Sequence, residues 1–150
     1  MGKCLLIAVL LLAAPGAGAG AAEQRAGELL IGQAWAAPSS ASKRSGSIYL
    51  TIHNAGAEPD WLLGAHSPAA TITELRSHRA GPVAGPARKV LGIALPAGKT
   101  VALKPGAELI ALIDVNQPYR IGDTVPVTLI FQRAGEITID VPVLAEAPKP

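Results

Sequence analysis

Sulfur is almost absent from this sequence. Its 150 residues include one cysteine, Cys4, and one methionine, Met1, and both lie in an N-terminal segment that we expect to be removed. The rest of the chain can form no disulfide and offers no thiolate or thioether to a metal ion. Cysteine nucleophiles and metal sites that need a sulfur ligand are therefore excluded from it.

Aromatic residues and excess charge are also scarce. Only 3% of the residues are aromatic, and 13 Lys and Arg residues stand against 11 Asp and Glu residues. Removal of Lys3 with the N-terminal segment lowers the net charge from +2 to +1. Nucleic-acid binding needs stacking platforms or a strong basic patch, so this composition argues against it.

Long apolar runs are missing, apart from a short one at the N-terminus. Lys3 precedes an apolar stretch at 4–14 and a run of small residues at 15–22, with cleavage candidates AGA at 17–19 and 19–21. Eleven apolar residues are too few to cross a bilayer core of about 30 Å. We interpret 1–22 as a cleaved signal peptide and 23–150 as one periplasmic domain without stable membrane insertion. A retained anchor is the alternative; a lipoprotein is disfavoured because Cys4 precedes the apolar stretch.

Helical periodicity is absent after residue 22, and period-two alternation replaces it. Ile48, Leu50 and Ile52 fall on one face of their segment, with Tyr49 and Thr51 on the other. Gly, Pro, Asn and Asp turns separate such segments at intervals of about ten residues. The pattern predicts an all-β, Greek-key β-sandwich with strands at 28–35, 47–54, 61–65, 70–76, 100–103, 108–115, 124–132 and 136–143. The residues expected in or beside its core are Trp35, Tyr49, Ile52, Leu62, Leu103, Leu112, Leu129 and Ile139.

No constellation of catalytic residues is present. The sequence contains no Gly-x-Ser-x-Gly elbow, and the adjacent His66 and Ser67 do not form a triad. Asp114, Asp123 and Asp140 fall at strand ends or turns, where paired carboxylates in a cleft cannot be argued. We predict a protein that is not an enzyme and has no catalytic or cofactor-binding residues.

Six stretches of the domain resemble the periplasmic copper chaperone family PCuAC. They are AWA at 34–36, IYLTI at 48–52, NAGAEPD at 54–60, LPAG at 95–98, LKPG at 103–106 and GDTVPVTL at 122–129. The resemblance implies a cupredoxin-like β-sandwich, which agrees with the strand pattern.

Members of that family hold Cu(I) with two His and two Met in the spacing H-x10-M-x21-H-x-M. The flanking motifs place these ligands at Arg76, Ala87, Leu109 and Ala111, with the spacing preserved without a gap. None of the four side chains is a copper ligand, and guanidinium stays protonated with no lone pair to donate. We therefore expect the family's Cu(I) site to be lost, and we assign no metal ligand.

Other polar residues leave alternatives open. His53 and His66 are expected to be solvated. Glu74 and His78 would share a face if their strand continues that far, and such a pair could hold Zn²⁺ or Cu²⁺ weakly. A surface network with Arg76 is the competing interpretation.

A second open question concerns four cations near the expected site. Arg76, Arg79, Arg88 and Lys89 would form a cluster at one end of the sandwich. Such a cluster either binds an anion or acidic partner, or is a solvated loop edge.

Two functions are compatible with the sequence. The resemblance implies a copper-delivery accessory that works beside envelope copper-trafficking proteins or an intact paralogue, for example in supplying cytochrome oxidase. The alternative is an envelope domain that binds other proteins and no metal.

Overall fold

The computed structural model describes residues 23–39, 42–79 and 85–149, which form strands, turns and loops without a helix. The segment interpreted as a signal peptide, 1–22, lies outside the described residues. Within the described part of the chain, no helix has the length and apolarity to cross a bilayer. The strands are β1 (Gln24–Ala26), β2 (Leu29–Ala36), β3 (Ser45–Asn54), β4 (Asp60–His66), β5 (Ala70–Ser77), β6 (Arg88–Lys89), β7 (Ile93–Leu95), β8 (Thr100–Leu103), β9 (Glu108–Val115), β10 (Thr124–Phe131) and β11 (Gly135–Pro142).

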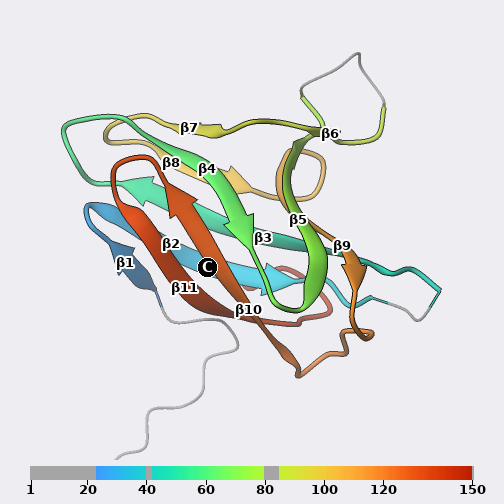
Figure 1. The fold of residues 1–150 in the computed structure, drawn as a ribbon. Coiled ribbons are helices and arrows are strands. Elements are labelled where there is room, and N and C mark those ends of the chain that lie inside the picture. The colour runs from blue at the N-terminus through green and yellow to red at the C-terminus, as the bar shows by residue number, and fades with distance from the viewer. Residues whose placement is uncertain (1–22, 40–41, 80–84, 150) are drawn as a thin grey trace, which may run out of the picture.

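The strands form two antiparallel sheets that pack face to face (Figure 1). The larger sheet has the order β1-β2-β3-β9-β5-β6, and β8 pairs with the part of β3 that β9 leaves free. The smaller sheet has the order β11-β10-β4-β7. One buried cluster contains side chains from both sheets. The predicted all-β sandwich is confirmed.

The eight predicted strands correspond to β2, β3, β4, β5, β8, β9, β10 and β11, with ends that agree within two residues. The prediction missed β1, β6 and β7. These strands contain two or three residues each, too few for an alternating pattern to be visible in the sequence.

All eight side chains that we expected in or beside the core are buried. Ile48, Leu50 and Ile52 point from β3 into the space between the sheets, as their alternation predicts. Trp35 and Tyr49 are also buried, but they belong to a second cluster on the outer face of the larger sheet.

A β-bulge in β2 places Trp35 on that outer face. Gly32 is paired with Thr51, and the next pair is Trp35 with Tyr49, so β2 contains one residue more than β3 across this stretch. Gln33 in the bulge adopts a left-handed φ of 51°. The extra residue reverses the alternation, and Trp35 therefore joins Tyr49 outside the sandwich.

Candidate functional site

The four positions that the resemblance assigns to copper ligands come together on the outer face of the larger sheet. In the pairing of β5 with β9, Arg76 lies opposite Leu109 and Glu74 lies opposite Ala111. Directly opposite residues project to the same side of a sheet. Nη1 of Arg76 donates a hydrogen bond of 3.4 Å to the carbonyl oxygen of Ala87. Positions spread over 36 residues of sequence are thus neighbours in space.

Apolar side chains fill this part of the outer face. Trp35, Tyr49, Leu109 and Ala111 form one buried cluster, and Ala87 packs against it. The ring centroids of Trp35 and Tyr49 are 5.0 Å apart, with the planes tilted by 36°. Leucine and alanine side chains carry no donor atom, so three of the four positions contribute only hydrocarbon.

Arg76 supplies the only polar side chain among the four positions, and it is engaged. Oε2 of Glu74 accepts a hydrogen bond of 3.2 Å from Nε of Arg76 and lies 3.1 Å from Nη2. The other carboxylate oxygen lies 3.5 Å from Nζ of Lys89. The Glu74 side chain is only 14% exposed. Arg76 thereby connects β5 to the segment that enters β6, and one carboxylate offsets two cations.

The remaining members of the predicted cationic cluster differ in their pairing. Nε of Arg79 lies 3.9 Å from Oε1 of Glu108. Arg88 is exposed on β6 and forms no ion pair with a carboxylate in the described ranges. The cluster is therefore split by two carboxylates into paired residues and one unpaired arginine.

None of the three histidines occupies one of these four positions. His53 is only partly buried on β3, where its Nδ1 lies 2.9 Å from the hydroxyl oxygen of Thr100. His66 is exposed at the end of β4. The strand β5 ends one residue before His78, so the condition for a shared face with Glu74 is not met. Across 23–39, 42–79 and 85–149, no group of three or more His, Cys, Asp or Glu side chains is placed to hold a metal ion.

A comparison with protein families matches residues 29–143 to a family described as lipoprotein LpqE-like. The chain belongs to the LpqE-like family. This is the family of PCuAC copper-chaperone domains, so the resemblance drawn from the sequence is confirmed at the level of the family. A search of curated proteins finds no match.

Solved PCuAC structures share the fold of this LpqE-like domain. The copper-bound PCuAC domain from PmoF2 is 25% identical, with a TM-score of 0.72 over 83% of this chain and 99% of that domain. The apo PCuAC domain from PmoF1 has the same identity and TM-score over 83% of this chain and all of that domain. The Cu(I) form of DR1885 from Deinococcus radiodurans is 26% identical, with a TM-score of 0.60 over 75% of this chain and 77% of that protein.

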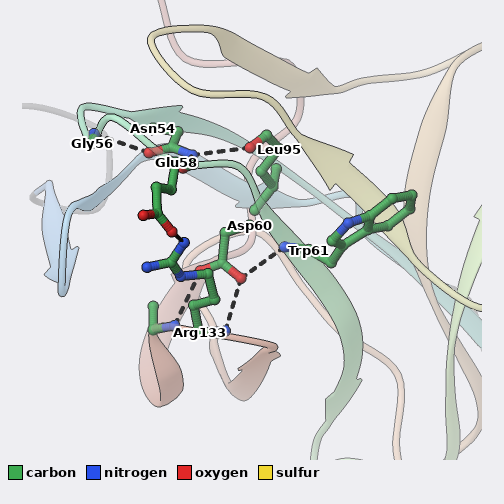
Figure 2. Close-up of polar contacts among 8 residues, drawn as sticks. Asn54, Gly56, Glu58, Asp60, Trp61, Leu95 and Arg133 are labelled. Atoms are coloured by element: carbon green, nitrogen blue, oxygen red, sulfur yellow. Dashed lines mark hydrogen bonds and ion pairs between the residues drawn. The ribbon is translucent and has the colours of Figure 1, made fainter.

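Asp60, the last residue of the motif at 54–60, has a structural role in this LpqE-like domain (Figure 2). Its carboxylate is buried, and Oδ1 accepts hydrogen bonds from the backbone N–H groups of Trp61 at 2.7 Å and Arg133 at 2.9 Å. Oδ2 accepts a third from the N–H of Ala134 at 3.0 Å. The carboxylate therefore ties β4 to the turn between β10 and β11.

Asn54, the first residue of the motif, also has a structural role. Its Nδ2 donates to the carbonyl oxygens of Glu58 at 2.8 Å and Leu95 at 2.9 Å, and its Oδ1 accepts from the N–H of Gly56 at 3.0 Å. All polar atoms of this buried side chain are occupied by backbone groups. The motif thus holds turns and edge strands in place, and a structural role accounts for it.

Tyr119 borders a separate cavity of about 700 Å³ between the β4–β5 turn and the β9–β10 connection. Its hydroxyl donates a hydrogen bond of 3.1 Å to the carbonyl oxygen of Ala69. Burial disfavours the phenolate and raises the pKa of Tyr119 above its ordinary value near 10.0. No pattern in the sequence marks this residue, because a lone tyrosine in a loop belongs to no motif.

Proposed function

We propose that this LpqE-like protein is an exported accessory of copper delivery that does not itself hold Cu(I). One observation carries the proposal. The guanidinium of Arg76 lies where the family's ligand positions meet, and it is bonded to Glu74 and to the carbonyl of Ala87. The family supports the copper context, and the residues at these positions argue against direct binding.

The chemistry of the four positions does not fit Cu(I). This soft ion is held by thioether and imidazole groups, whereas these positions offer hydrocarbon and a guanidinium. A fixed positive charge about 4 Å from a bound cation costs on the order of 4 kcal/mol at an effective dielectric constant near 20. The nearby carboxylate of Glu74 is a hard ligand, and two cations already compete for it.

The proposed role is therefore protein binding and not catalysis. The partner would be an intact PCuAC paralogue or another envelope copper-trafficking protein. The alternative is an interaction domain unrelated to metal. Titration of the isotope-labelled domain with an intact PCuAC domain separates the two: contact that depends on copper loading supports the accessory role, and contact with both forms alike, or with neither, favours the alternative.

A competition titration tests the absence of copper binding. The protein with residues 23–150 should leave Cu(I) on a bicinchoninate-type chelator. The variant with Arg76→His, Ala87→Met, Leu109→His and Ala111→Met should remove Cu(I) from the same chelator, because the four positions are already adjacent.

A triple variant tests the combined effect of the arginine and of the missing imidazole. The triple variant that keeps Arg76 should bind Cu(I) at least a hundredfold more weakly than the quadruple variant. It lacks one imidazole ligand and keeps a cation whose repulsion is about 4 kcal/mol. Stoichiometric uptake of Cu(I) by the unmodified domain would overturn the proposal.

Export is the second part of the proposal. A periplasmic protein released by cleavage should begin between Gly20 and Glu23. The intact mass of protein expressed with its own N-terminal segment measures this. A membrane-bound species that retains Met1 would contradict the cleavage.

A further inference from the structure

The outer face of the smaller sheet exposes large apolar side chains on β4. Trp61 is 42% exposed and Leu63 is 46% exposed, while Leu62 between them is fully buried. Strand alternation therefore directs Trp61 and Leu63 away from the core. Figure 2 shows the indole of Trp61 directed away from the side chain of Asp60. Neither residue was assigned a role by the family resemblance.

Leu91 extends this surface from the connection between β6 and β7. Its side chain is 89% exposed. The adjacent Gly92 lies against both side chains of β4, since a Cβ built there would be 3.4 Å from Cε3 of Trp61 and 3.9 Å from Cδ2 of Leu63. We call the surface formed by Trp61, Leu63 and Leu91 the apolar edge.

Cations border the apolar edge. Arg88 is exposed three residues before Leu91 and has no carboxylate partner in the described part of the chain. Arg79, with 67% of its side chain exposed, lines a cavity of about 350 Å³ together with Val90 and Gly92. The edge therefore combines projecting hydrocarbon with two exposed guanidinium groups. That of Arg88 is unpaired in the described ranges, and that of Arg79 lies 3.9 Å from its nearest carboxylate, Glu108.

We propose that the apolar edge, with Arg79 and Arg88, docks on the surface of an anionic membrane. Leucine inserts into the boundary between headgroups and acyl chains, and tryptophan is favoured at that depth. Arginines beside the inserted groups attract anionic headgroups. The exposed side chain of Leu91 fits the acyl boundary, and the unpaired Arg88 three residues before it fits the anionic headgroups. The proposal does not depend on whether the domain binds copper.

The fluorescence of Trp61 can report membrane docking in the protein with residues 23–150. The background variant Trp35→Phe removes the other tryptophan, so the emission reports Trp61 alone. Vesicles of phosphatidylcholine that contain phosphatidylglycerol should shift the emission to the blue. Vesicles of phosphatidylcholine alone should produce a smaller shift, and added salt should reduce the first shift.

Variants in the same background distinguish docking by the edge from general adsorption. Leu63→Ser and Leu91→Ser should each weaken binding to the anionic vesicles about tenfold, because each removes hydrocarbon from the inserted surface. Arg88→Gln should weaken it about fivefold. Ile72→Ser is the matched control: Ile72 is also 46% exposed, but it lies on the outer face of the larger sheet, and its replacement should change nothing.

Several outcomes would overturn the proposal. One is the absence of a blue shift with anionic vesicles. Others are equal binding to neutral vesicles, or an equal loss of binding with Ile72→Ser. Failure to bind vesicles while the same edge captures a protein partner would show that the surface is a protein interface instead.

Discussion

The carboxylate of Asp60 should be a large contributor to the stability of this domain. It is 4% exposed and accepts three backbone hydrogen bonds, from Trp61, Arg133 and Ala134. Hydrogen bonds to a charged group contribute about 1.5–3 kcal/mol each, although the contributions do not add fully. Asp60→Ala leaves three donors without their acceptor, and we expect a loss of about 3–5 kcal/mol.

Asp60→Asn is the sharper experiment, because the variant should still fold. The amide oxygen can keep the donors that bind Oδ1, whereas the NH2 group must face the N–H of Ala134. One bond is lost and two donors oppose each other, so we expect a loss of about 2 kcal/mol.

Urea denaturation at neutral pH measures both variants. The midpoint should fall while the m-value stays constant. Asp123→Asn is the matched control: Asp123 is exposed and Oδ2 accepts a single bond of 2.8 Å, from the N–H of Arg120. The control should lose about 0.5 kcal/mol. If Asp60→Asn and Asp123→Asn lower stability equally, the reasoning about the buried carboxylate is wrong.

Two further predictions concern burial. Because the pKa of Tyr119 is raised in the folded state, the unfolded state releases the phenol proton at a lower pH. The free energy of unfolding should therefore decline as the pH rises past 10.0. Tyr119→Phe should remove part of that decline in alkaline denaturation curves. Leu62→Ala should cost about 3 kcal/mol in urea denaturation because Leu62 is fully buried. Leu91→Ala should change stability by less than about 0.5 kcal/mol because Leu91 is exposed. Similar losses of stability in both variants would contradict this packing.

Local patterns in the sequence were sufficient for the class of fold and for most strands. Strands of four or more residues were predicted from alternation and turn residues, and Ile48, Leu50 and Ile52 face the core as expected. Alternation is a property of consecutive residues, so it can be recognised without any knowledge of distant contacts. The absence of sulfur from residues 23–150 is likewise a fact of composition alone.

Long-range contacts decided what local pattern could not. The phase of β2 would have put Trp35 between the sheets, and only the pairing with β3 shows the bulge that turns it outward beside Tyr49. The donors that Asp60 binds in the β10–β11 turn are 73 and 74 residues away in sequence.

The candidate site likewise depends partly on the sequence and partly on the tertiary structure. The sequence and its resemblance to the family are enough to assign Arg76, Ala87, Leu109 and Ala111 with an ungapped spacing. Their meeting on one face depends on the register of β5 with β9, and the pairing of Arg76 with Glu74 depends on side-chain placement there. Sequence determines which atoms are present at each position, whereas the tertiary structure determines which of them are close enough to interact.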